Sequence, residues 1–470
     1  MSAKEAATQG HSKQRMLEKD RKYVWHHMSP HNEGPMIIVS GEGCWLTDMD
    51  GNRYYDAISG LWCVNIGYGR KEMAKAAAEQ MDNVAYVPMT QAHIPGIELA
   101  ERISEWLGGG YRILFSNSGS EANEAAFKIA RQYFNQIGQP ERHKFISRHR
   151  AYHGSSMGAL AATGQAQRKM RYEPLGTGFL HVPPPYCYRC PFGQNKDSCR
   201  MECAEIYDQV MEWEGAQTVA GVILEPVITG GGMIVPPQDY MKRVKEICDK
   251  HGALLIVDEV ICGYGRSGRR FGHHNFGVQP DIVTMAKGLT SAYSPLSATA
   301  VREDLYDAFR LSGGLDHFRH INTFGGNPVS CAVANKNLEI IERERLVDHA
   351  SELGRRLRDR LMSLASHPYV GDIRTFGFAA GIELVEDKET KKPASSDLIA
   401  KVMTACKQRG LLIGKNGDTT PGYANVLTLA PPFVAAFEEV DWMVSTLAIA
   451  LSMLPLYDGK EVGLTNGWRE

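Results

Sequence analysis

The sequence predicts an α/β protein in which a large, mostly parallel sheet is flanked by helices and joined to a smaller α+β domain. Between about residues 110 and 302, short apolar runs alternate with helical patterns, which is typical of βαβ units. These runs are continuously apolar, as expected for strands that helices cover on both faces. A chain of 470 residues that is 43% hydrophobic and 23% charged can bury a core of that size.

The strands predicted for the large domain are short apolar runs. They comprise residues 112–115, 144–147, 220–226, 253–257, 281–286 and 296–301. The clearest helix lies between the third and fourth of them. There, Tyr240, Met241, Val244 and Ile247 recur at helical spacing, and Gly252 is a typical helix stop.

The rest of the chain follows a different pattern. Residues 330–365 are predicted to form one or two long amphipathic helices, and residues 373–385 and 425–433 contain strands before a helical C-terminus. We therefore assign residues 61–329 to a large domain and residues 330–470 to a small one. Residues 1–60 are expected to contribute to the small domain.

Composition and charge exclude several classes of protein. The formal net charge is −2, from 52 Lys plus Arg against 54 Asp plus Glu, and the signs are interleaved, so neither nucleic acid nor a membrane is expected as a partner. No apolar run approaches the ~18 residues that span a bilayer. The N-terminal segment is polar and lacks a signal sequence, so we expect a cytoplasmic protein. Ten Cys residues are too dilute for a disulfide scaffold.

Distinctive residues follow four of the predicted strands, and ligands of open α/β sheets bind at such strand ends. Residues 118–120 place small side chains and free N–H groups at the start of a helix, where a phosphate binds well. Residues 152–154 bring an aromatic ring beside His and Gly. Asp258, followed by Val260, and Lys287 come after two further strands.

Each of these features has an ordinary explanation when taken alone, such as a helix cap, a loop cap or a solvated charge. Together they suit a flat phosphorylated aldehyde with a ring nitrogen, namely pyridoxal 5′-phosphate (PLP). Lys287 is then the amine that binds the aldehyde, and Asp258 keeps the ring nitrogen protonated. Tyr152 and Val260 would contact the two faces of the ring. The adjacent Glu259 is expected to be structural.

Four ordered motifs carry a resemblance to a known family. IVDEVICGYGRSG and PDIVTMAKGL place Lys287 29 positions after Asp258, and NSGSEANEAAFKIAR and NTFGGNPVSCA stand at compatible spacing. The chain resembles the class III aminotransferases, which are PLP enzymes of fold type I, over residues 44–433. Within that class, LWCVNIGYGR at residues 61–70 is similar to the ω-amine:pyruvate transaminases.

The resemblance implies roles for individual residues. Lys287 and Asp258 are the implied catalytic residues, and Lys287 moves a proton between the substrate Cα and the cofactor. The implied cofactor-binding residues are Ser118, Gly119, Ser120, Tyr152, His153, Glu225, Asp258, Val260, Lys287 and Thr323. The implied substrate-binding residues are Trp62, Tyr152, Gly230 and Lys415. Because Thr323 would reach the phosphate of a neighbouring subunit, the resemblance implies a homodimer, with a tetramer as the alternative. The N-terminal segment is expected to lie at the interface.

The sequence departs from the family pattern at one position. Many relatives carry a movable arginine, in the loop before the late APP stretch, that binds the carboxylate of the keto acid. Here the loop reads LLIGKNGDTTPGYANVLTLAPPF, and the matching position is Gly414, beside Lys415. Lys415 can act as a point charge but cannot reproduce a bidentate guanidinium. Pyruvate and 2-oxoglutarate both stay open as acceptors.

The segment CYRCPFGQNKDSCRMEC raises the question of a metal. Its four thiols, at Cys187, Cys190, Cys199 and Cys203, have a C-x2-C-x8-C-x3-C spacing that could bind zinc. We favour free or packed thiols over a metal site.

The predicted function is a PLP-dependent transamination. An amine such as β-alanine, taurine or an aryl or alkyl amine gives its amino group to PLP, leaving pyridoxamine 5′-phosphate (PMP). A keto acid, which we expect to be pyruvate, then takes up the group. The alternatives are another reaction on the same scaffold, namely a racemase, an aminomutase or a dialkylglycine decarboxylase, and a PLP-binding protein without catalysis.

Overall fold

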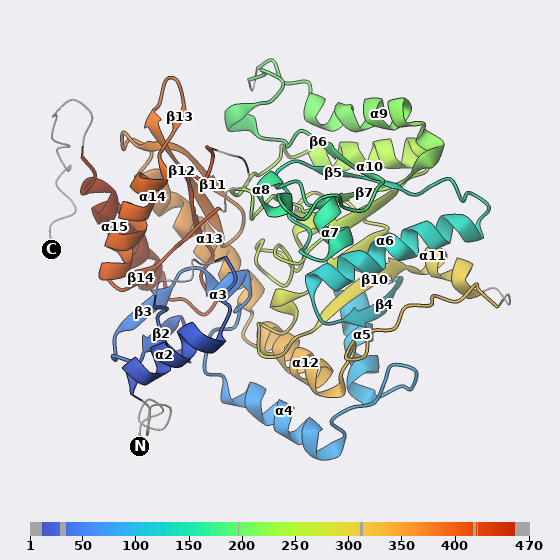
Figure 1. Ribbon diagram of the computed structural model, residues 1–470, viewed down its shortest axis with the longest axis horizontal. Coiled ribbons are helices and arrows are strands. Elements are labelled where there is room, and N and C mark those ends of the chain that lie inside the picture. The colour runs from blue at the N-terminus through green and yellow to red at the C-terminus, as the bar shows by residue number, and fades with distance from the viewer. Residues whose placement is uncertain are drawn as a thin grey trace.

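The computed structural model describes residues 12–28, 34–195, 197–310, 314–416, 420 and 422–455. A seven-stranded sheet lies at the centre of the region that the sequence assigns to the large domain (Figure 1). In spatial order its strands are β4 (Tyr111–Ser116), β10 (Ser297–Arg302), β9 (Ile282–Met285), β8 (Leu254–Asp258), β7 (Val219–Leu224), β5 (Lys144–Arg148) and β6 (Phe179–Val182). The six predicted strands are confirmed to within two residues at each end. The edge strand β6 was not predicted.

The sheet is mostly parallel, and β10 is its exception. β5, β6, β7, β8 and β9 pair in parallel, whereas β10 pairs antiparallel with both β4 and β9. β4 therefore runs in the same direction as β9. As a result, the carboxyl ends of six strands meet at one edge of the sheet, and the segments that follow them can build one site.

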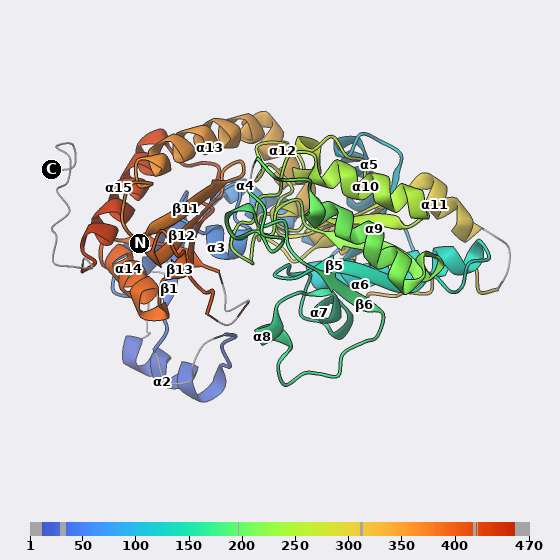
Figure 2. The ribbon, with the colours of Figure 1, turned by 90° about the horizontal axis from the view of Figure 1, so that it is seen from above.

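Helices cover both faces of this sheet. Leu254 and Ile256 of β8 pack in one cluster with α6 (Gly119–Gln136). Leu255 and Val257 pack in another cluster with α9 (Glu202–Glu214) and α10 (Tyr240–His251). Figure 2 shows α6 and α10 on opposite sides of the strands. This two-sided burial explains why the strand is continuously apolar.

Of two smaller sheets, one combines the N-terminal and C-terminal parts of the chain and the other is built from the C-terminal part alone. One consists of β1 (Ile38–Glu42), β2 (Trp45–Asp48), β3 (Arg53–Asp56) and β14 (Leu411–Leu412). The other consists of β11 (Val370–Thr375), β12 (Ala380–Asp387), β16 (Val426–Leu429) and β15 (Gly414–Lys415), with β13 (Lys392–Pro393) paired to β12. The parallel pairing of β14 with β3 brings residues 53–56 against residues 411–412.

The predicted helical stretch at residues 330–365 consists of two helices. α12 (Pro328–Arg343) and α13 (Leu346–Met362) are separated at Arg345, whose φ of 51° lies in the left-handed region. α14 (Ser396–Gln408) and α15 (Phe437–Ser452) complete the C-terminal part. The remaining helices are α2 (Lys13–Tyr23), α3 (Ser59–Trp62), α4 (Lys71–Asn83), α5 (Ile94–Trp106), α7 (Met157–Ala162), α8 (Ala166–Lys169) and α11 (Glu303–Asp307).

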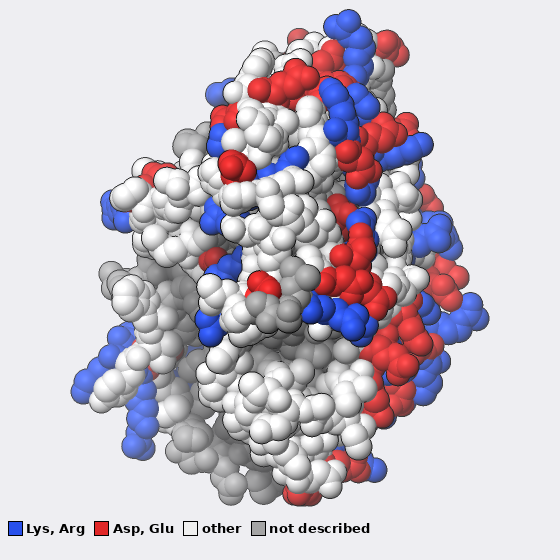
Figure 3. Space-filling view, turned by 90° about the vertical axis from the view of Figure 1, so that its right-hand side faces the viewer, with Lys and Arg blue, Asp and Glu red and all other residues white. Residues whose placement is uncertain are grey.

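The surface agrees with the interleaved charges of the sequence. On the face drawn in Figure 3, Lys and Arg side chains are interspersed with Asp and Glu. None of the helices in the described residues is both long and apolar enough to cross a bilayer.

Candidate active site

A cavity of about 180 Å³ lies at the carboxyl ends of the central strands. Its lining includes eight of the residues predicted to contact the cofactor: Gly119, Ser120, Tyr152, His153, Glu225, Asp258, Val260 and Lys287. Asn123, Gly154, Ile261 and Ala286 complete it. These residues follow the ends of five strands and are spread over 169 positions of the chain. They meet in one place because the five strands run in the same direction.

Asp258 is the buried acid of this cavity, with 4% of its surface exposed. Its Oδ2 atom accepts hydrogen bonds from His153 Nδ1 (2.8 Å) and Asn123 Nδ2 (2.9 Å). Its Oδ1 atom accepts one from the Val260 backbone N–H (3.1 Å). No Lys or Arg among the described residues forms an ion pair with Asp258. The geometry thus holds a fixed carboxylate against the cavity, without a cationic lysine or arginine partner.

Asn123 was not predicted from the sequence, yet it links three parts of the site. It lies on the buried face of α6, accepts a hydrogen bond from Thr284 Oγ1 (2.7 Å) and donates to the His153 carbonyl oxygen (2.6 Å) as well as to Asp258. A polar residue among the alanines of the buried helix face was the one sequence signal. It predicts a buried hydrogen-bond partner but does not identify that partner.

His153 has one ring nitrogen left over. Nδ1 is hydrogen-bonded to Asp258, whereas the buried Nε2 atom has no hydrogen-bond partner among the described residues. Because His153 lines the cavity, this polar atom could pair with a group bound there.

Glu225 is the second buried carboxyl in the lining, also 4% exposed. It accepts hydrogen bonds from the Tyr152 N–H (3.2 Å) and from Thr229 Oγ1 (3.0 Å). Burial, reinforced by the negative charge of Asp258, raises the pKa of the Glu225 carboxyl. Glu225 thereby fixes the backbone of Tyr152 and lies at the edge of the cavity.

Lys287 lies two residues after the end of β9 and supplies the amine of the cavity. Burial lowers the pKa of its ammonium, and the nearby Cys63, Asp258 and Glu225 only partly oppose that shift. Its φ of 44° is unusual for a residue with a side chain and indicates backbone strain held by the surrounding structure. A desolvated amine of this kind is suited to act as a nucleophile near neutral pH.

The first turn of α6 also lines the cavity and could hold an anion. Gly119 and Ser120 are its first residues, so their N–H groups have no partner within the helix. Space there is limited: a Cβ at Gly119 would lie 3.0 Å from Val260 Cγ2, and one at Gly154 would lie 2.5 Å from Ser120 Oγ. Gly154 has a φ of 138°, which side chains rarely tolerate.

Five predicted residues lie outside this lining. Ser118 is exposed and caps α6 by accepting from the Glu121 N–H (3.3 Å). Thr323 is exposed, and its carbonyl accepts a hydrogen bond from Tyr86 Oη (2.9 Å). Trp62 is buried in an apolar cluster that includes Met233 and Cys262.

Gly230 and Lys415 are the other two. Gly230 lies beside the cavity, because a Cβ there would be 3.8 Å from Tyr152 Cβ. Lys415 is exposed on β15. At its neighbour Gly414, a Cβ would come within 2.6 Å of Ile58 Cδ1 and Thr428 Oγ1. A side chain at this position would therefore require its surroundings to move.

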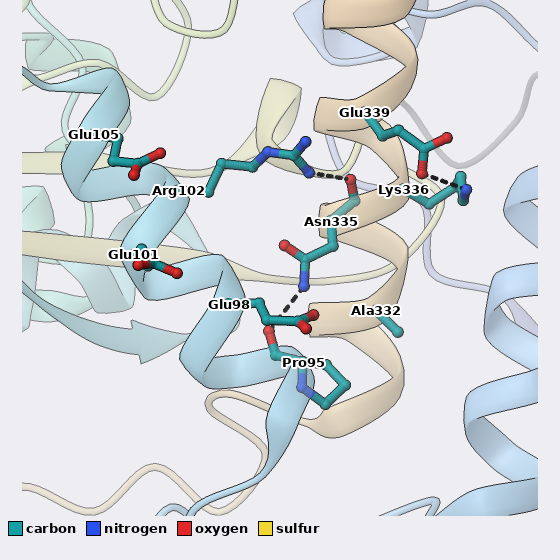
Figure 4. A pocket seen from close by; sticks show the side chains of 9 residues that line it. All are labelled: Pro95, Glu98, Glu101, Arg102, Glu105, Ala332, Asn335, Lys336 and Glu339. Atoms are coloured by element: carbon teal, nitrogen blue, oxygen red, sulfur yellow. Dashed lines mark hydrogen bonds and ion pairs between the residues drawn. The ribbon is translucent and has the colours of Figure 1, made fainter.

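Two further features carry none of the predicted chemistry. A hollow of about 470 Å³ between α5 and α12 (Figure 4) is crossed by hydrogen bonds from Asn335 Nδ2 to the Pro95 carbonyl (2.9 Å) and from Arg102 to the Asn335 carbonyl (3.0 Å). These bonds join the two helices. The four cysteines of residues 187–203 are unpaired thiols, and no three of them bring their sulfur atoms within 4.8 Å of one another in the described part of the chain.

Comparisons with known proteins identify the family. The family model described as aminotransferase class-III matches residues 28–451. The chain belongs to the class III aminotransferases. It is 57% identical to an uncharacterized aminotransferase, YhxA, of Bacillus subtilis, covering 92% of this chain and 96% of the relative. It is 42% identical to the taurine–pyruvate aminotransferase of Bilophila wadsworthia, covering 93% and 96%.

A solved structure of the same family contains the cofactor. The ω-transaminase from Pseudomonas jessenii in complex with PMP superposes with a TM-score of 0.88 at 34% identity, covering 93% of this chain and 97% of that one. Class III aminotransferases use PLP, so this chain is a PLP-dependent transferase of fold type I.

The cavity fits PLP on its own geometry. The first turn of α6 offers unpaired N–H groups for a phosphate, Asp258 offers a carboxylate without a lysine or arginine partner, and Lys287 offers a desolvated amine. His153, whose Nε2 atom has no hydrogen-bond partner among the described residues, lines the same cavity.

Proposed function

We propose that the protein transfers an amino group from an ω-amine to pyruvate by a ping-pong mechanism. The supporting observation is the cavity in which Lys287, Asp258 and Glu225 meet. The donor class is inferred from the relatives, one named as a taurine–pyruvate aminotransferase and one as an ω-transaminase. Bound PLP would supply an aldehyde that accepts the amino group and a protonated ring that withdraws electrons from the substrate Cα.

The residues of this chain would divide the work as follows. Asp258, fixed by His153 and Asn123, holds a positive charge on the ring nitrogen through a charge-assisted hydrogen bond. Lys287 Nζ binds the cofactor and then carries a proton to and from the substrate Cα, for which its lowered pKa is suited. Tyr152 and Val260 restrain the ring.

We further propose which residues hold the phosphate. Ser118, Gly119 and Ser120 would surround it from one subunit, and Thr323 of a second copy would reach it from the other. Thr323 is well placed to meet another chain because it lies beside exposed apolar residues, namely Phe324, Ile321 and Tyr86. This proposal implies a homodimer. In each subunit, residues 61–329 would form the cofactor domain.

A donor and acceptor panel tests the proposed reaction. Holoenzyme is incubated with β-alanine, taurine, 4-aminobutyrate, putrescine or 1-phenylethylamine, and with pyruvate or 2-oxoglutarate. We expect alanine from at least one ω-amine with pyruvate, no release of CO₂ and no racemisation of L-alanine. Turnover with 2-oxoglutarate but not with pyruvate as acceptor, or release of CO₂, would contradict the proposal and favour another class III reaction.

Light scattering at defined protein concentration tests the dimer. We expect twice the chain mass of 52.1 kDa or a multiple of it. A monomer with full turnover would refute shared active sites.

A further inference from the structure

A second cavity adjoins the cofactor cavity. Its volume is about 370 Å³, and its lining consists of Met28, Tyr152, Ser155, Met157, Leu160, Gln167, Arg168 and Tyr172. Tyr152 lines both cavities, so the two spaces share a wall. Most of its walls are aromatic or aliphatic, and none carries a carboxylate.

Arg168 is the one cation in this lining. Its guanidinium carbon lies 4.7 Å from the centre of the Tyr152 ring, and its Nε donates to Gln165 Oε1 (2.7 Å). These two contacts fix the plane of the guanidinium. In the described part of the chain Arg168 forms no ion pair, so its terminal nitrogens are available to an anion that enters the cavity.

The other cations near the sheet edge are less suited to this role. Arg266 is 2% exposed and donates to the carbonyl oxygens of Phe378 and Pro431. Arg150 is also buried and donates to the Gly231 carbonyl. Lys415 is exposed on β15 and lines neither cavity. A ligand can reach Arg168 without displacing any of these contacts.

We propose that Arg168 binds the acidic group of the substrate, the carboxylate of pyruvate or the sulfonate or carboxylate of a short ω-amino acid. This inference rests on the proposed function and deepens it, because it assigns the anion contact that Gly414 cannot supply. One guanidinium among apolar walls matches a substrate with one acidic group. Pyruvate is therefore preferred over 2-oxoglutarate, whose second carboxylate meets no second cation in this lining.

The experiment compares substrates with and without an acidic group. The two half-reactions of the holoenzyme are followed separately by the absorbance of its cofactor, with taurine or 1-phenylethylamine for the first and pyruvate for the second. In Arg168→Gln we expect kcat/KM to fall about 10- to 100-fold for taurine and pyruvate, as for the loss of a charge-assisted hydrogen bond. The value for 1-phenylethylamine, which has no acidic group, should fall far less and shows that the variant is folded.

Arg171→Gln is the matched control. Arg171 is exposed, lies three positions further along and lines neither cavity, and the substitution removes the same charge. We expect its kcat/KM values for taurine and pyruvate to resemble those of the wild type. An equal loss for all three substrates in Arg168→Gln, or a selective loss of the acidic substrates in Lys415→Gln, would overturn the inference.

Binding of an inert anion gives a readout that does not depend on turnover. Ethanesulfonate has the acidic group of taurine but no amine, and its binding to holoenzyme is measured by calorimetry. We expect saturable binding by the wild type and by Arg171→Gln and none by Arg168→Gln. If the wild type makes no alanine yet binds ethanesulfonate through Arg168, the proposed reaction fails while the anion site stands. Equal binding by Arg168→Gln refutes the anion site alone.

Discussion

Asp258 and Glu259 are neighbours in the sequence but belong to two different regions of the molecule. Asp258 faces α6 and the cofactor cavity. Glu259 is fully buried on the other side and accepts hydrogen bonds from the N–H groups of Gly272 (2.8 Å) and His273 (2.7 Å) and from His273 Nδ1 (2.7 Å). The alternation of side chains along a strand separates them, as it separates Ile256 from Val257 in β8.

The difference shows how one strand end can serve both catalysis and stability. Each donor around Glu259 comes from the protein, so that region is complete in itself. The cavity side keeps a desolvated lysine, a strained backbone at Lys287 and an unpaired His153 nitrogen. Such features cost stability and are retained where a ligand completes the site.

The largest expected effect is on turnover in Lys287→Ala. Removing the amine that binds the cofactor and moves the proton should lower kcat by at least the 10²- to 10⁴-fold that proton transfer contributes. The measurement is alanine formation at saturating donor and pyruvate. Turnover comparable to that of the wild type would mean that the cavity side of the strand end does not carry catalysis.

A smaller loss is expected for Asp258→Asn. The amide keeps the shape of the side chain but not the charge that pairs with the ring nitrogen, so kcat should fall roughly 10- to 100-fold, in line with the energy of a hydrogen bond to a charged group. The apoenzyme should also lose stability, because Asn123, His153 and Val260 lose a charged acceptor, so kcat is measured per bound cofactor. A large drop in apoenzyme stability with normal kcat would assign Asp258 to the structural region instead.

Glu259→Gln should lower stability without lowering kcat. Three donors lose a charged acceptor in a fully buried place, and we expect a loss of about 1–3 kcal/mol in the free energy of unfolding. The kcat per bound cofactor should stay near the wild-type value. Chemical denaturation measures the free energy of unfolding, and cofactor titration of the same preparation gives the bound cofactor to which kcat is referred. A loss of kcat without a loss of stability would contradict the structural role of Glu259.

The smallest effect concerns pH. Burial lowers the pKa of Lys287 in the folded apoenzyme. At a pH between this lowered pKa and the ordinary pKa of ~10.4, the lysine is protonated in the unfolded chain but not in the folded chain. Apoenzyme stability therefore rises with pH over this window. Lys287→Met should be more stable than the wild-type apoenzyme at neutral pH, and the gap should narrow as pH approaches ~10. A gap that does not change with pH would indicate that the amine is not desolvated.

The sequence predicted the centre of the site because its signals are local. Continuous apolar runs that end in Asp258 and Lys287 define strands with known exits, and parallel strands bring their exits together. The reversed direction of β10 was not predictable, because a short apolar run carries no information on its polarity in the sheet.

Contacts made by tertiary packing were also beyond the sequence. Asn123 sits in a helical pattern, and only the packing of α6 on the sheet shows that it meets Asp258. Arg168 has the appearance of a solvated charge until α8 places it over the ring of Tyr152. The steric limit at Gly414 likewise depends on Ile58 and Thr428, which are distant from it in the chain.

The central claim is that Lys287 and Asp258 hold the two ends of one PLP molecule. Borohydride reduction of the holoenzyme fixes the cofactor to the lysine that binds it, and peptide mass mapping then identifies that lysine. We predict one modified peptide, containing Lys287, and a weakened label in Asp258→Asn at limiting PLP. Modification of another lysine, such as Lys169 or Lys415, with Lys287 unmodified would contradict the account.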